Sequence, residues 1–288
     1  MPRHIVITPV KNEERFIQGL IQSMVNQKVL PSTWIIVDDC SNDGTKTIID
    51  QAANEYPWIR YEYSGLERPR SRGEKISKLF TKGIEACESH WDYCSKIDAD
   101  MILPGDYFEV ILNEFQQDEK LGICSGNCYY EKAGKKKFEK VIPGHTRGGL
   151  KTYRYQCYID IGGIPPVDGW DGIDNTLARM RGWEARNLNR LFVHHRRETG
   201  SFDGALRGAY ENGKRSHFMG YSPFYMSIKT VHHAISKFSL LSSISMFIGY
   251  VASLISLKPK YENREVIKQI RREKYGVLKA YFFGWMRF

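Results

Sequence analysis

The chain has 288 residues and a formal net charge of +9, and 42% of its residues are apolar, 26% charged and 13% aromatic. This composition excludes an intrinsically disordered chain, a collagen-like repeat and a disulfide-stabilised scaffold. The length allows one large α/β domain or two smaller domains.

The cysteines and the N-terminus both indicate a cytoplasmic protein. Six cysteines are present, but no two of them form a Cys-x-x-Cys pair. Reduced thiols are therefore expected rather than disulfides or a zinc site. The first residues, MPRHIVITPVKNEE, contain no apolar stretch long enough for a signal peptide.

The first hundred residues alternate between two kinds of pattern. Apolar, β-branched runs at 4–10 and 34–37, an alternating segment at 58–63 and the segment 93–97 predict strands, and the segments between them have helical spacing. This alternation is typical of βαβ units. We therefore expect an α/β fold with a Rossmann-like, mostly parallel central sheet flanked by helices.

Polar residues follow three of these strands, within 8–14, at 38–39 and at 98–100. In parallel sheets, ligands bind beyond the carboxyl ends of the strands. The convergence of three polar strand ends therefore predicts a ligand site at this edge. No Gly-x-Gly-x-x-Gly and no Walker A motif follows the first strand, which argues against dinucleotide binding and P-loop chemistry.

Two pairs of aspartates at this edge are candidate ligand-binding residues. Asp98 and Asp100 are spaced to reach one divalent cation, Mg²⁺ or Mn²⁺, which would bridge a diphosphate. A turn cap or a solvated loop would produce the same pattern. Asp39 is expected to accept hydrogen bonds from a base or ribose, whereas Asp38 either binds ligand or caps the next helix.

A third pair of carboxylates is a candidate for proton transfer. Asp171 and Asp174 stand at the start of a helix predicted over 175–181. The helix dipole favours an ionised carboxylate at this end, so either residue is a candidate general base. Simple helix capping is the alternative interpretation.

Histidine and lysine residues provide further candidates with two interpretations each. His194 and His195 are neighbours on a predicted strand, so at most one of them faces a site. That histidine is either a third metal ligand or a packed side chain. Lys75, with Arg72 as its competitor, would contact a diphosphate unless it is simply a surface residue.

The C-terminal third contains an uncharged segment, 238–257, followed by a basic tail. The tail, 258–288, has nine Lys and Arg against three Asp and Glu. A helix in the membrane interface, a membrane span and a packed helix of the body all remain open for 238–257. The tail favours an anionic membrane surface, and no nucleic-acid-binding motif is present.

Taken in order, five motifs resemble those of family-2 glycosyltransferases with the GT-A fold. They are Ile-Thr-Pro-Val-Lys-Asn-Glu-Glu (7–14), Ile-Ile-Val-Asp-Asp-Cys-Ser-Asn-Asp-Gly-Thr (35–45), Ile-Asp-Ala-Asp (97–100), Gly-Gly (162–163) and Asp-x-x-Leu-x-x-x-Arg-Gly (174–182). The resemblance covers residues 4 to about 200.

The resemblance implies a division of the chain into two parts. Residues 1–200 would form the GT-A domain, with a nucleotide-sugar half over about 1–100 and an acceptor half over about 101–200. Residues 201–288 would form a helical, basic extension that associates with a membrane.

The resemblance also implies roles for the candidate residues. Asp39 would bind the base, Asp98 would lie near the ribose, and Asp100 would hold the cation. Asp174 would be the catalytic base, with Asp171 as the alternative because Ile173 stands where the family often has Glu. The nucleotide pocket would be lined by Thr8, Pro9, Val10 and Glu13, and Val10 occupies a position where the family often has an aromatic residue.

The implied reaction is an inverting, metal-dependent transfer of one sugar from a nucleoside-diphosphate sugar. A UDP-sugar is favoured as donor, and Mn²⁺ or Mg²⁺ as cofactor. The expected acceptor is a lipid-linked or surface-polysaccharide precursor at the inner face of the cell membrane. Two alternatives stay open: a catalytically impaired nucleotide-sugar-binding or membrane scaffold protein, and a nucleotidyltransferase.

Overall fold

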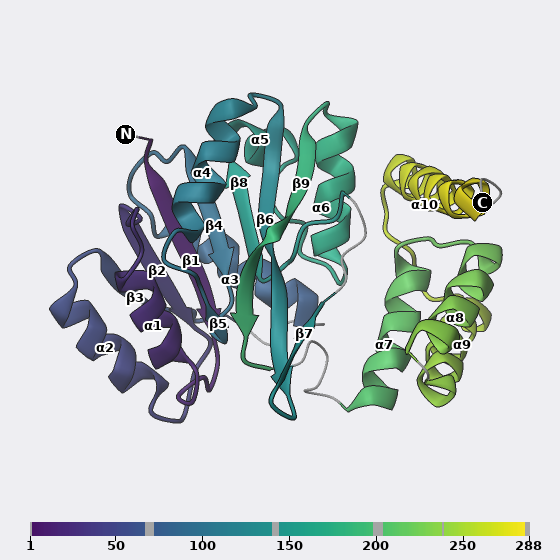
Figure 1. Cartoon of the computed structure of the whole chain (residues 1–288), viewed down its shortest axis with the longest axis horizontal. Helices are drawn as coiled ribbons and strands as arrows, with labels where there is room; N and C mark the ends of the chain where they lie inside the picture. The colour runs from purple at the N-terminus through teal and green to yellow at the C-terminus, as the bar shows by residue number, and fades with distance from the viewer. Residues whose placement is uncertain (1, 67–71, 140–143, 198–203, 238, 286–288) are drawn as a thin grey trace. The chain divides into compact units, whose positions relative to one another are not determined.

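The computed structural model describes residues 2–66, 72–139, 144–197, 204–237 and 239–285, without the side chains of 72, 237 and 280–285. The chain divides into two compact units, Met1–Arg197 (unit 1) and Glu198–Phe288 (unit 2). Figure 1 shows strands and helices in unit 1 and helices in unit 2. Each unit is considered by itself below.

Unit 1 is built on one mixed sheet with the strand order β3-β2-β1-β4-β8-β6-β9-β5, and β7 pairs with β6 at the side. The strands are β1 (His4–Val10), β2 (Thr33–Asp38), β3 (Ile59–Tyr63), β4 (Tyr93–Ile97), β5 (Met101–Ile102), β6 (Leu121–Lys132), β7 (Lys135–Phe138), β8 (Leu150–Arg154) and β9 (Glu184–His195).

The direction of the strands changes after β4. Strands β1 to β4 pair in parallel, as the sequence predicts. Strand β8 then runs antiparallel to β4 and to β6, and β9 returns parallel to β6. The expectation of a mostly parallel sheet therefore describes the first half of unit 1, whereas the second half is mixed.

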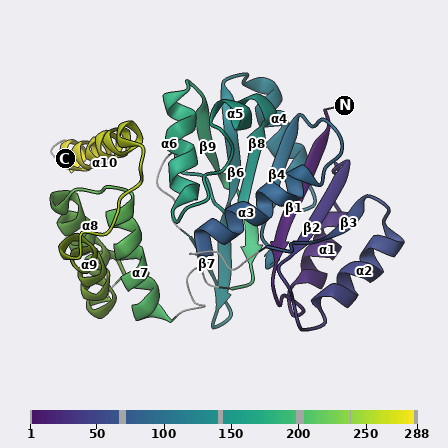
Figure 2. The same ribbon diagram turned by 180° about the vertical axis from the view of Figure 1, so that it is seen from behind.

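Apolar residues on both faces of the sheet explain why β1 and β2 are nearly continuous apolar runs. Val6 and Val10 of β1 belong to one core cluster, and Ile5 and Ile7 belong to the other. Helix α3 crosses the face seen in Figure 2. The helices of unit 1 are α1 (Ile17–Val25), α2 (Thr45–Glu55), α3 (Arg72–Glu85), α4 (Tyr107–Gln117), α5 (Tyr155–Asp160) and α6 (Trp170–Met180).

Unit 2 consists of α7 (Ala205–Phe218), α8 (Pro223–Lys237), α9 (Leu240–Ile255) and α10 (Arg264–Trp285). Helices α7 and α9 approach so closely that two glycines are required between them. A Cβ atom on Gly213 would lie 1.9 Å from the carbonyl oxygen of Met246, and one on Gly249 would lie 2.1 Å from that of Tyr210. Larger side chains at either position would separate the helices.

Helix α9 buries its small face and exposes much of its apolar face. Ser242, Ser243, Gly249 and Ser253 are among its buried residues. The exposed apolar side chains of α9 are Leu240, Leu241, Ile244, Phe247, Ile248, Leu254 and Ile255. In the described part of the chain, no helix has both the length and the apolar character needed to cross a membrane. Residue 238, at the start of the uncharged segment, lies outside the described residues.

Candidate active site

The loops that follow β1 and β2 are joined to each other by hydrogen bonds. The backbone N–H of Asn12 donates to Ser41 Oγ (2.8 Å), and that of Asn42 donates to Asn12 Oδ1 (2.9 Å). The backbone N–H of Glu13 donates to Thr45 Oγ1 (2.8 Å). Asn12 has φ of 54°, a left-handed conformation that asparagine tolerates better than most residues. The two loops therefore form one connected rim at the edge of the sheet.

Asp38 closes the second of these loops rather than capping α2. Its Oδ1 accepts hydrogen bonds from the backbone N–H (3.0 Å) and hydroxyl (2.6 Å) of Ser41. Its Oδ2 accepts one from the hydroxyl of Tyr61 (3.1 Å). Both oxygens of Asp38 are thus used within the protein, and the alternative of a cap on α2 is wrong because Asp43 bonds the Thr45 N–H instead.

Asp39 lies between two lysines. Its Oδ2 is 3.1 Å from Lys11 Nζ and also forms an ion pair with Lys75. Lys75 therefore contacts the carboxylate predicted to bind the base, and Lys11 is a neighbour that the sequence analysis did not select. The side chain of Arg72 lies outside the described residues.

The predicted pocket residues of β1 contribute little side-chain surface. Thr8 is fully buried, and its hydroxyl accepts a hydrogen bond from Trp34 Nε1 (2.9 Å). Val10 is part of the core, and Pro9 is half-buried. The prediction that Thr8 and Val10 line the nucleotide pocket can therefore apply only to their backbone atoms, because both side chains are buried.

The two aspartates after β4 have different surroundings. Asp98 is 40% exposed and forms an ion pair with the buried Lys96. Asp100 is 6% exposed, and its Oδ2 lies 2.6 Å from Arg197 Nε and 3.2 Å from His195 Nε2. Burial alone would raise the pKa of Asp100, but His195 and Arg197 lower it to about 2. Asp100 is therefore ionised at neutral pH.

A chain of charged groups extends from Asp100 in two directions. Arg197 also donates to Glu13 Oε1 (2.7 Å), and the other carboxylate oxygen of Glu13 is buried with no partner among the described residues. Burial raises the pKa of Glu13. On the other side, His195 Nδ1 lies 3.2 Å from Glu139 Oε1, and Glu139 forms an ion pair with Arg147.

His195 is the histidine that faces this network, and His194 faces away from it. The ring of His194 stacks on that of Tyr129, with centroids 4.9 Å apart and planes inclined by 8°. Burial lowers the pKa of His195, but its hydrogen bonds to Asp100 and Glu139 outweigh this and raise the pKa to about 9. The sequence alone left the choice between the two histidines open.

The residues around His195 offer donors for a divalent cation. Ligand atoms of Cys128, Glu139 and His195 lie within 4.8 Å of one another. His195 also reaches the carboxylate of Asp100 through its other nitrogen. The sequence predicts that Asp98 and Asp100 bind one cation together. In the structure, Asp98 forms an ion pair with Lys96, and the group beside Asp100 is the imidazole of His195.

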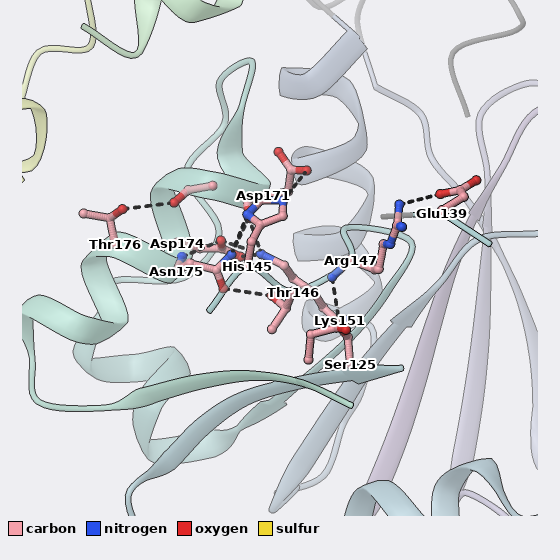
Figure 3. A network of polar contacts seen from close by, with 12 residues as sticks. Ser125, Glu139, His145, Thr146, Arg147, Lys151, Asp171, Asp174, Asn175 and Thr176 are labelled. Atoms are coloured by element: carbon pink, nitrogen blue, oxygen red, sulfur yellow. Dashed lines mark hydrogen bonds and ion pairs between the residues drawn. The ribbon is translucent and has the colours of Figure 1, made fainter. Parts of the chain in front are cut away.

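Figure 3 shows the two aspartates at the start of α6. Asp174 is fully buried, and both of its oxygens lie 2.5 Å from Lys151 Nζ. The Tyr153 hydroxyl (2.5 Å) and the backbone N–H of Asn175 (2.6 Å) also donate to it. Burial raises the pKa of Asp174 despite the nearby Lys151. No side-chain surface of Asp174 is left for a substrate.

Asp171 is the accessible carboxylate of this pair. It stands in the first turn of α6 with its side chain 40% exposed, and its Oδ2 is 4.0 Å from His145 Nε2. Gly148, next in sequence to Arg147, passes close by: a Cβ atom there would lie 3.1 Å from Asp171 Cβ. Helix α6 begins earlier than the sequence predicts, so Asp174 lies in its second turn.

The chain is similar to known proteins along much of its length. The model of glycosyl transferase family 2 matches residues 5–167. EpsH of Bacillus subtilis strain 168, a candidate glycosyltransferase by its name, is 24% identical over 249 residues, which cover 83% of this chain and 63% of EpsH. Poly-beta-1,6-N-acetyl-D-glucosamine synthase of Staphylococcus epidermidis is 24% identical over 116 residues, covering 40% of this chain and 26% of the synthase. The chain thus spans less than two thirds of either relative.

Solved structures share the fold at low sequence identity. The mannosyltransferase PcManGT of Pyrobaculum calidifontis, solved with GDP-Man and Mn²⁺, has a TM-score of 0.58 at 17% identity and covers 97% of this chain and 80% of its own. Residues 1–349 of TarS from S. aureus, solved with UDP-GlcNAc, have a TM-score of 0.56 at 14% identity, covering 92% and 78%. These likenesses establish the GT-A fold.

Proposed function

The chain belongs to glycosyl transferase family 2, and on that premise we propose that it transfers one sugar from a nucleoside-diphosphate sugar to a hydroxyl group, with inversion at the anomeric carbon. The observation that carries this proposal is the contrast between two carboxylates. Asp100 is buried and held ionised by His195 and Arg197, whereas the side chain of Asp171, in the first turn of α6, is 40% exposed. The carboxylate of Asp100 suits a cation bound to the leaving diphosphate, and the carboxylate of Asp171 suits proton removal from the acceptor hydroxyl.

The donor would lie along the rim formed by the loops after β1 and β2. Asp39 is the carboxylate there that would accept a hydrogen bond from the base, once Lys11 and Lys75 turn from it to the diphosphate. Asp98, half-exposed after β4, would accept from the ribose hydroxyls. A UDP-sugar is the favoured donor. TarS was solved with UDP-GlcNAc, and PcManGT, a second protein of this fold, with GDP-Man.

The residues around Asp100 fit a divalent cation. A buried, ionised carboxylate is a ligand that suits both Mn²⁺ and Mg²⁺. Asp100 would hold the ion, and His195 would become a ligand only by giving up the proton that its raised pKa retains. The ion would neutralise charge on the diphosphate of the leaving nucleotide. Arg197 and the lysines near Asp39 would add positive charge on the same side. Glu139, whose Oε1 lies 3.2 Å from His195 Nδ1, would keep His195 in position.

Asp171 is the better placed of the two candidate bases. A base must come within hydrogen-bond reach of the acceptor hydroxyl, and the exposed carboxylate of Asp171 allows this. As the hydroxyl oxygen bonds to the anomeric carbon, its proton would pass to Asp171 while the bond to the diphosphate breaks on the opposite face. Asp174 would act as a positioning residue, because it fixes α6 to β8 through Lys151.

Unit 2 supports a membrane-bound acceptor. Residues 198–288 contain 14 Lys and Arg against six Asp and Glu, so +8 of the net +9 lies in this unit. The same unit exposes the apolar side chains of α9. Apolar side chains together with positive charge favour the surface of an anionic bilayer. We place the enzyme at the inner face of the cell membrane, with a lipid-linked or surface-polysaccharide precursor as acceptor.

A ligand-stabilisation experiment followed by product analysis tests the proposal. The melting temperature would be measured with UDP, GDP, CMP, dTDP and their sugars, each with Mn²⁺, Mg²⁺ or EDTA. A ligand at about 100 times its dissociation constant adds about 2.7 kcal/mol to the free energy of unfolding. The anomeric configuration of the product, read by NMR, would then show inversion.

Each outcome of this experiment assigns a function. Metal-dependent stabilisation by one nucleotide together with turnover supports the proposal. Nucleotide-dependent stabilisation without turnover would support the non-catalytic binding protein instead. Cleavage of the diphosphate bond of the donor, rather than of its sugar bond, would support a nucleotidyltransferase.

A further inference from the structure

Two lysines of unit 2 lie over the ring of Tyr221, and Arg215 acts on one of them through its charge. Lys229 on α8 has its Nζ 5.3 Å from the centroid of the Tyr221 ring, and Lys274 on α10 has its Nζ 5.5 Å from the same centroid. Arg215 on α7 is near enough to lower the pKa of Lys229 by its charge. We refer to Arg215, Lys229 and Lys274 as the cation cluster. It draws one residue from each of three helices.

Within the described part of unit 2, the hydrogen-bond partners of Lys229 are uncharged. Lys229 Nζ donates to Ser216 Oγ (3.0 Å) and lies 3.4 Å from Asn212 Oδ1, both uncharged acceptors. Among the described residues, no carboxylate forms an ion pair with any member of the cluster. Burial, followed by the charges of Lys274 and Arg215, lowers the pKa of Lys229 to about 7. The like charges repel one another, and an anion would remove that repulsion.

The chemistry of the cluster indicates which anion this is. Two ammonium groups and a guanidinium, with the Ser216 hydroxyl beside them, provide many more donors than one carboxylate can accept. A phosphate group offers several acceptor oxygens and up to two negative charges. We infer that the cation cluster binds a phosphate group.

Apolar side chains next to the cluster indicate a lipid as the source of that phosphate. Phe224 is 64% exposed, and its ring stacks on that of Tyr275 at 6.5 Å. Tyr275 follows Lys274 directly on α10, and its hydroxyl lies 2.7 Å from Ser222 Oγ. A phospholipid headgroup or a lipid-linked acceptor would present a phosphate and an acyl chain together. This inference rests on the proposed membrane function and names the group that unit 2 would bind.

Calorimetry with inorganic pyrophosphate tests the inference on the full chain. EDTA would be present, so that no divalent cation assists binding near Asp100. The variant Lys229→Met/Lys274→Gln removes two charges of the cluster, and Lys258→Gln/Lys268→Gln removes two exposed charges of the same unit. We expect the first variant to weaken pyrophosphate binding about tenfold or more and the second to change it by less than about twofold. Equal affinities in the two variants would overturn the inference.

Proton uptake gives a readout specific to Lys229. An anion beside Lys229 raises the pKa of its ammonium group, so binding at pH 8 should take up protons from the buffer. Calorimetry in two buffers of different ionisation enthalpy measures this uptake. The single variant Lys229→Met should lose it, and Lys258→Gln should keep it. Uptake that persists in Lys229→Met would place the titrating group elsewhere and contradict the inference.

Vesicles distinguish the two sources of phosphate. The chain would be sedimented with phosphatidylcholine vesicles, with or without phosphatidic acid. If phosphatidic acid increases the fraction of protein bound to vesicles, and Lys229→Met/Lys274→Gln loses this increase, the phosphate belongs to a lipid. If pyrophosphate binds but phosphatidic acid causes no such increase, the ligand is a free phosphate. Stabilisation by UDP, measured on the same variants, reports separately on unit 1. If UDP stabilised none of these proteins, the proposed glycosyl transfer would be refuted. Equal pyrophosphate affinities in the two double variants would refute only phosphate binding by the cation cluster.

Discussion

Lys151 and Asp174 form an ion pair in which neither side chain is exposed, with Lys151 Nζ 2.5 Å from both carboxylate oxygens. Register places Lys151 of β8 opposite Lys96 of β4. The pair thus joins α6 to the middle of the sheet. Breaking a buried ion pair leaves an uncompensated charge and costs about 3–5 kcal/mol.

Asp174→Asn and Asp171→Asn should therefore affect different properties. We expect Asp174→Asn to lower the free energy of unfolding by several kcal/mol, about 3–5. We expect Asp171→Asn to leave stability and donor binding unchanged while it slows transfer by about 10²–10⁴-fold. Denaturant unfolding and a turnover assay measure the two effects. The double variant Lys151→Met/Asp174→Asn should recover stability, and a stable Asp174→Asn with no turnover would return the role of base to Asp174.

Asp100→Asn and Asp98→Asn form a matched pair for the cation. Asp100 faces His195, whereas Asp98 faces Lys96. We expect Asp100→Asn to abolish the Mn²⁺-dependent part of the stabilisation by a nucleoside diphosphate, and Asp98→Asn to retain it. Thermal unfolding with Mn²⁺ or EDTA makes the comparison. Equal loss in both variants would restore the predicted metal pair of Asp98 and Asp100.

Because α7 and α9 are in close contact, a single methyl group added between them should lower the stability of unit 2. In Gly213→Ala, the new Cβ would lie 1.9 Å from the Met246 carbonyl oxygen, so the helices must separate. We expect destabilisation of unit 2 by about 1–3 kcal/mol or more. Gly276→Ala on α10 is the control, because nothing lies within 4 Å of the added Cβ. That change should stabilise the helix by up to about 1 kcal/mol, as denaturant melts followed by circular dichroism would show.

The pKa of Lys229 predicts how stability depends on pH. Burial and its basic neighbours lower this pKa from 10.5 to about 7 in the folded chain. Between these pH values the unfolded chain binds more protons, so the free energy of unfolding rises with pH. We expect this rise to be smaller in Lys229→Met. Parallel slopes for the two proteins between pH 7 and 10.5 would show that Lys229 has an ordinary pKa.

The exposed side chains of α9 predict which substitutions weaken membrane binding. Ile244 and Ile248 are 45% and 52% exposed. Burying one such side chain in lipid contributes about 1.5–3 kcal/mol, so Ile244→Ser/Ile248→Ser should reduce partitioning onto anionic vesicles by about tenfold or more. Leu30→Ser, at a 48% exposed site of unit 1, is the control. Sedimentation with anionic vesicles at low salt measures the binding of both variants. Unchanged vesicle binding by Ile244→Ser/Ile248→Ser would exclude α9 as the lipid-facing helix.

The sequence predicts the strands of unit 1 better than its later elements. The segments 4–10 and 93–97 coincide with β1 and β4, because both are short and end at a polar loop. Helix α6 starts at Trp170 rather than at 175, since Gly169 takes a left-handed conformation and Trp170 packs into the core. Strand β9 starts at Glu184, earlier than the apolar run at 191–195. Its polar first half gives no strand pattern.

The site was predictable where its residues follow a strand, and not where they meet across the fold. Asp39, Asp98 and Asp100 are marked by their position after buried runs. Arg197 is 97 residues from its partner Asp100, and Glu139 is 56 residues from its partner His195. No local sequence pattern indicates either contact. The burial of Asp174 depends on Lys151 in another strand. Local sequence therefore predicts carboxylates as candidate site residues, but it does not predict their environments.

The hydrogen bonds between Asn12, Ser41 and Asn42 have a consequence for the energetics of donor binding. A loop that must become ordered around its ligand loses conformational entropy at that moment, which weakens the affinity. Here the two loops that would contact the base are already fixed to each other in the free protein. Their ordering belongs to folding, so the interactions with the nucleotide count almost fully toward its affinity. With the proposed donor, the rim would act as a preorganised receptor rather than as one that forms by induced fit.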